Sequence, residues 1–373
     1  MTRRPARAHL HAAHRLRLIA LILAPILLSG CYITRAAYEE GRILWNRKPI
    51  DDALAREDLP ADIRVKLQTV LAVRKFAADD LGLNVGGAYE SFANVDKGAI
   101  VHVVMAAPRD SLEPYTWWFP IVGRVPYRGY FEQSDANAEA AALEADGLDT
   151  MVRPSIAFSS LGFFDDPLLS NLLKLDRVEL AGVLIHELFH RTYYLASDAM
   201  FDESAANYVG SAGAVAFFAA TDGESAPSTI AARGILDSDL KFARFLLQEQ
   251  ARLLRIYTAD LPKDQVDKQR EAAFAAIKAD YAALAPSLSG LERFDLDKQP
   301  LNNAVLVNYL IYFHQLDNFA ALDRMNHGDL RATIAQIISI AKAHPDDPFY
   351  AISQVVSPAA STRDSSASLP PKK

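Results

Sequence analysis

The sequence Val183-Leu184-Ile185-His186-Glu187-Leu188-Phe189-His190 places a His-Glu-x-x-His motif inside an apolar run that favours a helix. Two histidines four positions apart lie on the same face of a helix, so both imidazoles can reach one metal ion. Glu187 lies beside them, where its carboxylate can accept a proton from a water on that ion. The pattern therefore predicts a metal site with a general base. The alternative is a pair of partly buried histidines hydrogen-bonded to carbonyl groups.

A second helix is expected shortly after the motif, beginning at Phe201 with acidic residues in its first turn. Glu203 follows His190 by thirteen positions and is the candidate third ligand. This spacing lets the first helix end near Tyr194, turn through residues 196–198 and return antiparallel. Two histidines and a glutamate leave the fourth position of a zinc ion open for water, which is typical of catalytic zinc sites.

Three polar residues near Glu203 are candidates for hydrogen-bonding to a metal-ligating side chain and so fixing its orientation. Asn207 lies four positions after Glu203, on the same helix face. Asp198 and Asp202 are the other two candidates, because carboxylates commonly hydrogen-bond the residues that bind a metal.

Length and charge limit the class of protein. The chain has 373 residues, half of them hydrophobic, which suits one large domain or two closely packed ones. The formal charge is −7 and no basic stripe is present in the body of the chain. Nucleic acid is therefore not an expected partner.

The first thirty residues read as a secretion signal. Five arginines and no acidic residue precede a short apolar run over residues 18–28, which is too short for a comfortable membrane span. Leu28-Ser29-Gly30-Cys31 then resembles a bacterial lipobox, in which lipid is attached to the cysteine after cleavage. Cys31 is the only cysteine in the chain, so lipidation explains it better than disulfide chemistry. An ordinary signal peptide with an incidental cysteine is the alternative.

The expected location follows from the same segment. Removing five positive charges from a formal charge of −7 leaves the mature chain near −12, so acyl chains rather than basic residues would hold it at a membrane. Tyr32, and not aspartate, follows the cysteine. By resemblance to Gram-negative lipoproteins, this favours the outer membrane, facing the periplasm.

Apolar spacing and turn residues predict the remaining elements. A strand is expected over residues 99–105, and helices over residues 61–81, 136–146, 237–256, 263–284, 302–316 and 330–343. Residues 31–225 would form the catalytic region and residues 226–356 a helical subdomain. Residues 357–373, rich in Ser, Ala and Pro, are expected to be disordered.

Two segments upstream of the motif are candidates for substrate contacts. Residues 115–131 are unusually aromatic and are interrupted by Pro and Gly, so they form either core packing or a binding wall. Arg128 within them would bind a carboxylate or oxyanion, or form a structural ion pair. Residues 153–162 predict a strand and a turn. Their Ser155–Ser160 segment is either a sheet edge that pairs with a peptide substrate or an ordinary interior strand.

Several motifs together resemble those of a bacterial family of predicted zinc aminopeptidases, many of them lipoproteins. The residues that carry the resemblance are Trp117-Trp118-Phe119-Pro120, Val125-Pro126-Tyr127-Arg128-Gly129-Tyr130-Phe131, Ser159-Ser160-Leu161-Gly162-Phe163-Phe164-Asp165-Asp166-Pro167, the His186–His190 motif, Phe201-Asp202-Glu203-Ser204 and Leu301-Asn302-Asn303-Ala304. The resemblance implies that His186, His190 and Glu203 bind zinc and that Glu187 is the general base. It departs at Asp202, where the family usually has Asn, and at Ala205, where Phe is usual. Asp202 places a competing carboxylate next to Glu203.

The expected fold is an α+β, predominantly helical one, with a zincin-like metallopeptidase core, a small sheet and a C-terminal helical subdomain. The expected activity is that of a peptidase, specifically an aminopeptidase, that uses one zinc ion to hydrolyse a peptide substrate. Tyr127, Tyr193, Tyr194 and Tyr208 are candidates for stabilising the oxyanion. The alternatives are a lipid-anchored endopeptidase or amide hydrolase of the cell envelope, and an envelope assembly factor that binds zinc without catalysis.

Overall fold

The computed structural model describes residues 41–95, 101–119, 122–155, 165–290, 294 and 296–357. The predicted signal peptide, Cys31, residues 156–160 of the candidate sheet edge and the tail from residue 358 lie outside these residues. Residues 1–47 form one unit, of which residues 41–45 are described as helical, and residues 48–373 form the other. In the described part of the chain, no helix has the length and apolar character needed to cross a membrane.

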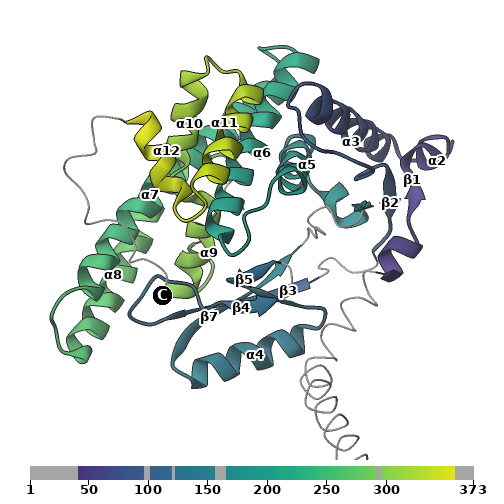
Figure 1. Ribbon diagram of the computed structural model, residues 1–373. Coiled ribbons are helices and arrows are strands. Elements are labelled where there is room, and N and C mark those ends of the chain that lie inside the picture. The colour runs from purple at the N-terminus through teal and green to yellow at the C-terminus, as the bar shows by residue number, and fades with distance from the viewer. Residues whose placement is uncertain are drawn as a thin grey trace, which may run out of the picture. The chain divides into compact units, whose positions relative to one another are not determined.

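The second unit contains an antiparallel sheet built around β3 (Val101–Pro108), which pairs with β6 (Arg128–Tyr130) and β7 (Leu148–Ser155). Alternate residues of β3 face opposite sides. Val104 and Ala106 pack against α4 (Gln133–Ala145), whereas Val103 and Met105 join the main core. Figure 1 shows α4 along one side of this sheet and the other helices on the opposite side. The predicted strand is confirmed from residue 101 onward.

The other strands are very short. In the aromatic stretch, β4 (Trp117–Phe119) pairs with β5 (Gly123–Val125). A separate sheet joins three segments that are distant in sequence, namely β1 (Lys48–Pro49), β2 (Ser91–Ala93) and β8 (Leu168–Leu169). These strands were not predicted, because two or three residues are too few to show an alternating pattern.

The N-terminal half contributes helices α2 (Ile50–Leu54), α3 (Ala61–Asp79), α5 (Arg177–Thr192) and α6 (Ala199–Thr221), with a 3₁₀ turn η1 (Ser170–Lys174). Asp176 and Glu179 form a capping pair at the start of α5. The Asp176 carboxylate accepts the N–H groups of Val178 and Glu179, and the Glu179 side chain accepts the N–H of Asp176. The two ends of this pair fix the start of the helix that carries the histidines.

Helix α6 is buried on almost every side from Phe201 to Ala214. It packs against α5, α7, α9, α10 and α11, as Figure 1 shows near the middle of the helical layer. Its small residues, mostly Ala, Gly and Ser, allow this close packing. A helix that is apolar all round is expected inside a large core and not at a surface.

The C-terminal half is helical, as predicted. It comprises α7 (Pro227–Tyr257), α8 (Lys263–Leu284), a 3₁₀ turn η2 (Ala285–Ser287), α9 (Asn303–Phe313), α10 (Leu316–Met325), α11 (Leu330–Ala343) and α12 (Pro348–Val356). Two predictions were wrong in detail. Helix α7 begins ten residues before the predicted start, because Pro227 initiates it at the first helical turn. The helix predicted over residues 302–316 ends at Phe313, since Gln315 adopts a left-handed conformation with φ 49° and starts α10 in a new direction.

The predicted boundary at residue 225 falls inside one compact unit. Helix α6, which precedes the boundary, packs directly on α7 and α9, which lie beyond it. A buried ion pair also crosses it, because Arg270 of α8 bonds to Asp149 of β7. The same carboxylate accepts the N–H of Asn303 at 2.9 Å, at the start of α9. The helical region is therefore part of the fold that carries the histidine motif.

The buried side chain of His314 predicts that the free energy of unfolding falls at acidic pH. Burial lowers the pKa of His314, at the end of α9, to about 4, and its ring packs edge-on against Phe349. The unfolded chain binds a proton below about pH 6.5 while the native chain does not, so the free energy of unfolding falls from about pH 6.5 down to pH 4. At pH 5 the expected loss is about 2 kcal/mol relative to pH 7. Urea unfolding at both pH values should show a smaller loss in His314→Gln; equal losses would contradict this.

Candidate metal centre

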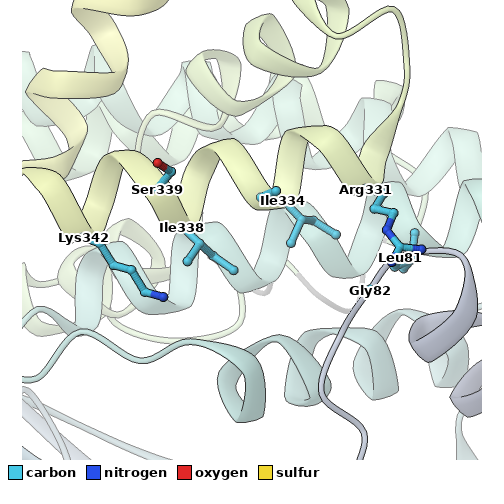
Figure 2. A pocket seen from close by; sticks show the side chains of 8 residues that line it. Leu81, Gly82, Arg331, Ile334, Ile338, Ser339 and Lys342 are labelled. Atoms are coloured by element: carbon cyan, nitrogen blue, oxygen red, sulfur yellow. The ribbon is translucent and has the colours of Figure 1, made fainter.

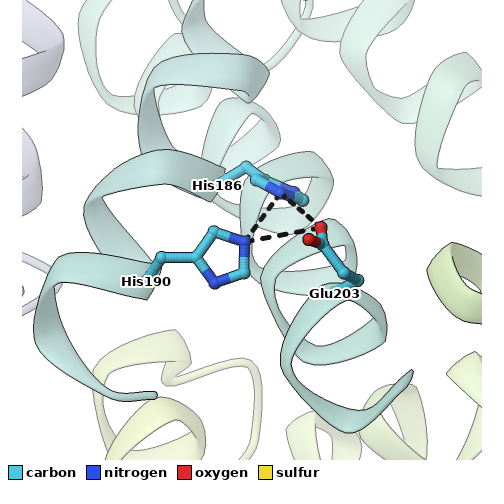
Figure 3. A group of neighbouring side chains, drawn as sticks. All are labelled: His186, His190 and Glu203. Carbon is cyan, nitrogen blue, oxygen red and sulfur yellow. Dashed lines mark hydrogen bonds and ion pairs between the residues drawn. The ribbon is translucent and has the colours of Figure 1, made fainter. Parts of the chain in front are cut away.

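Three side chains from two neighbouring helices converge as the motif predicted. The Nε2 atoms of His186 and His190, both on α5, are 3.1 Å apart. Oε2 of Glu203, on α6, lies 3.2 Å from Nε2 of His186 and 3.5 Å from Nε2 of His190. Figure 3 shows the two imidazoles and the carboxylate facing one point. Among the described residues, these three form the group of His, Cys and acidic side chains able to hold an ion.

These separations fit a zinc ion. A tetrahedral ion with bonds of about 2.1 Å separates its ligand atoms by about 3.4 Å, close to all three distances. Two imidazole nitrogens and one carboxylate oxygen are also a ligand set that zinc accepts, and they leave a fourth position for water. The residues therefore fit the ion that the motif implies.

Two glycines let the helices that carry these ligands approach closely. Gly182 of α5 faces Gly210 of α6, and a Cβ placed on Gly210 would lie 2.7 Å from the Gly182 carbonyl oxygen and 3.1 Å from Cβ of His186. The backbones are thus too close for any side chain at Gly210. A Cβ on Gly182 would meet its nearest atom, the Gly210 oxygen, at 3.7 Å, which is ordinary contact.

Gly210→Ala is therefore expected to push the helices apart and to move Glu203 away from the histidines. The predicted loss of zinc affinity is about tenfold to hundredfold, as when the support of a metal ligand is disturbed. Gly182→Ala is the matched control, since it adds the same methyl group to a helix with room for it. Competition titration with a chromogenic chelator measures both variants. Equal affinities would show that the glycine contact does not set the ligand geometry.

The three candidate ligands His186, His190 and Glu203, here called the triad, shift one another's pKa values. Burial opposes ionisation of Glu203, yet the facing His190 and His186 hold the pKa of its carboxyl far below the ordinary range. Burial would likewise lower the pKa of His190, but the Glu203 carboxylate, which faces it and bonds to it, raises that pKa to about 9. Glu203 therefore stays ionised, as a metal ligand must be.

Glu187 is half-buried beside the two histidines on α5. Its pKa is raised, first by burial and then by the nearby carboxylates of Glu203 and Asp166. The two histidines oppose this shift. A carboxylate with a raised pKa holds a proton more readily than an ordinary one, which suits a general base. Burial, and then the charge of Glu187, raise the pKa of Tyr89. This tyrosine is buried, and its backbone is left-handed with φ 60°. Strained backbone of this kind is concentrated at functional sites.

Two of the predicted tyrosines lie near the triad. The hydroxyl of Tyr127 donates to Oε1 of Glu203 at 3.3 Å, which holds one carboxylate oxygen and leaves Oε2 facing the histidines. The Tyr194 hydroxyl donates to the Val122 carbonyl at 3.4 Å. After burial, the charges of Asp202 and Glu203 raise the pKa of this phenol. Burial raises the pKa of both phenols well above the ordinary value, and the Glu203 carboxylate adds to the shift in each.

Tyr312, at the end of α9, was not predicted. Its ring stacks on His186, with centroids 6.4 Å apart and an interplanar angle of 24°. Burial and then the charge of Glu203 raise the pKa of its phenol, and Glu187 adds to the shift. The phenol oxygen accepts a hydrogen bond from Arg153 at 3.2 Å. No sequence pattern marked this residue, because it reaches the site from more than a hundred positions downstream.

Helix α6 itself fixes the position of Tyr312. The hydroxyl of Ser204 donates to the Ile311 carbonyl at 2.8 Å, and the Asn207 amide donates to the Tyr312 carbonyl at 3.0 Å. These carbonyls belong to the last turn of α9, where intrahelical donors are missing. Asn207, predicted to orient a ligand, therefore orients the helix end that carries Tyr312.

Other predicted residues contact different parts of the structure. Asp202 accepts the Leu195 N–H at 2.8 Å, and Asp198 accepts the Phe201 N–H at the start of α6, so both hold the turn between the helices. The Tyr208 hydroxyl donates to Asp323, and Tyr193 lies under the Lys342 ammonium. Arg128 lies 3.8 Å from Glu139 and over the Tyr130 ring, which agrees with the structural ion pair. None of these residues belongs to the triad.

A groove of about 430 Å³ lies along α11, apart from the residues of the triad. Figure 2 shows Ile334 and Ile338 on its wall, with Arg331 and Lys342 toward its two ends. None of the residues predicted for catalysis lines it. The groove therefore contributes nothing to the metal centre.

Comparison with known proteins gave one match. A family model described as "Putative aminopeptidase" matches residues 31–348, which include every residue of the triad and Tyr312. No curated protein matches the chain. No solved structure matches it either.

Proposed function

Because the chain belongs to the family described as putative aminopeptidases, we propose that it is a zinc-dependent peptidase in which His186, His190 and Glu203 hold the ion. The observation that carries this proposal is the set of separations of 3.1, 3.2 and 3.5 Å among the three ligand atoms. The family description supports a peptidase. The geometry supports zinc as its cofactor, because the distances and the donor types both suit it.

The residues around the three ligands have different roles in the proposed hydrolysis. When bound, a zinc ion would lower the pKa of its water to about 7 and polarise the substrate carbonyl. Glu187 accepts the proton of the attacking water and passes it to the leaving amine. Its raised pKa favours both steps at neutral pH, because the carboxylate accepts the proton readily and can still release it.

Protonated phenols supply the stabilisation of the oxyanion. Burial and nearby carboxylates keep Tyr127, Tyr194 and Tyr312 protonated at neutral pH, so each can donate a hydrogen bond. Tyr312 is favoured among the three. Its oxygen already accepts from Arg153, whereas the hydroxyls of Tyr127 and Tyr194 donate to protein groups. The Tyr312 proton is thus available for a developing negative charge on the substrate.

A digest of a peptide library by the zinc-loaded mature protein, followed by mass spectrometry, tests the proposal. We expect cleavage that a chelator abolishes and added zinc restores. Aminopeptidase action further predicts loss of single residues from the N-terminus and little cleavage of N-acetylated twins of the same peptides. Equal cleavage of blocked and free peptides would exclude recognition of the amino group and leave an endopeptidase. The absence of any cleavage would overturn the peptidase proposal.

A further inference from the structure

Arg153 is a partly buried cation that has neutral partners. It lies on β7, where its Nε donates to Oδ1 of Asn308 at 2.9 Å and its Nη2 donates to the Tyr312 oxygen at 3.2 Å. In the described part of the chain, no carboxylate lies within ion-pair distance of its guanidinium. Removing a charge from water without an opposite charge is costly. Three other arginines with little exposed side chain face an acid: Arg74 with Glu90, Arg191 with Asp165 and Arg270 with Asp149.

The guanidinium contacts Tyr312, the residue that stacks on His186 of the candidate metal centre. Its carbon is 5.7 Å from the centroid of the Tyr312 ring, and that ring stacks on the metal-ligating His186. The phenol of Tyr127 bonds to Glu203. Burial raises the pKa of this phenol, and the positive charge of Arg153 opposes that shift. Asn308 and Tyr312 are four positions apart on one face of α9, so a single helix face holds the guanidinium in place.

We propose that Arg153 binds the free C-terminal carboxylate of a short peptide, which makes dipeptides and tripeptides the substrate class of this site. A guanidinium presents a planar fork of donors that matches a carboxylate. Its Nη1 has no hydrogen-bond partner among the described residues, so this group is available to a ligand. Bound substrate would also supply the missing negative charge.

The distance between Arg153 and the triad limits the length of a peptide that can contact both. The Tyr312 ring lies 6.4 Å from the His186 ring and 5.7 Å from the guanidinium carbon, so Arg153 is at most about 12 Å from His186. Successive residues of an extended chain are about 3.5 Å apart, so a carboxylate can contact Arg153 only if it lies within about three residues of a scissile carbonyl held at the triad. A long protein chain would bring a neutral amide to the same place and leave Arg153 without an anion. This inference rests on the peptidase function proposed above.

The test compares a dipeptide with its C-terminal amide, using the zinc-loaded mature protein. We expect kcat/KM to be about tenfold to hundredfold higher for the free acid, the usual effect of one hydrogen bond to a charged group. Arg153→Gln should bring the ratio of acid to amide close to one, and Arg153→Lys should restore part of it. Arg255→Gln removes a charge from an exposed position of α7 and should keep the wild-type ratio.

A binding measurement that needs no turnover accompanies the kinetics. Titration of the dipeptide and of its amide into metal-free protein, followed by calorimetry, should show tighter binding of the acid, and Arg153→Gln should remove the difference. If the wild-type protein cleaves and binds both peptides equally, the carboxylate role of Arg153 is wrong and the peptidase proposal stands. If neither peptide is cleaved but the acid still binds through Arg153, the peptidase proposal fails and the anion subsite stands.

Discussion

Glu187→Gln is expected to lower kcat/KM for peptide hydrolysis by about a thousandfold, the effect expected when a general base is lost. The amide keeps the shape of the side chain but cannot accept a proton from water. Glu187 contributes no atom to the group of ligands, so the variant should still bind one zinc ion. Its raised pKa in the wild-type protein is consistent with the same role.

The measurement pairs initial rates with metal content. Zinc per chain should match the wild-type protein by atomic absorption, while hydrolysis of the peptide found in the library digest falls. Glu113→Gln changes an exposed acid in a loop and controls for the change in charge. Full activity of Glu187→Gln would remove this carboxylate from the mechanism. Loss of zinc together with activity would show instead that Glu187 is needed to hold the ion.

Glu203→Ala is expected to weaken zinc binding by more than about a hundredfold, beyond the range seen for residues that only support a ligand. The substitution removes the Glu203 carboxylate oxygen that lies within 3.5 Å of Nε2 in both imidazoles. It also leaves a cavity beside two histidines that then face each other without an anion. Activity should fall with the zinc content.

Asp202→Ala is the matched comparison, because it removes a carboxylate from the adjacent position of the same helix. Asp202 bonds to the Leu195 N–H and lies outside the triad, so this variant should retain one zinc ion per chain. Circular dichroism compares the helical content of the two variants. If zinc stays with Glu203→Ala and leaves with Asp202→Ala, the third ligand has been assigned to the wrong acid.

The histidine motif and Glu203 could be predicted because their geometry is local. The helical repeat places His186 above His190, and a short turn returns the chain to bring Glu203 opposite them. The capping pair of Asp176 and Glu179 before the motif is local in the same way, since its two residues are three positions apart. Each of these predictions needed only a few neighbouring positions.

Tyr312 and Arg153 depend on contacts between distant segments, and their roles could not be predicted. The sequence gives α9 an apolar composition all round, so it does not indicate which of its residues faces the metal site. In the sequence, Arg153 is marked only as the first residue of the strand and turn predicted over residues 153–162. Its role becomes visible once β7 and α9 are seen to lie side by side, with Asn308 and Tyr312 directed at its guanidinium.

The burial of α6 on all sides has a consequence for engineering. A catalytic fragment that ended at residue 225 would expose the apolar flank that α7, α9, α10 and α11 cover, and the acidic ligand would have no rigid support. We therefore expect that the residues proposed for hydrolysis cannot be transferred to another protein as a fragment without α7, α9, α10 and α11. A chain that lost these C-terminal helices is expected to lose the proposed peptidase activity as well.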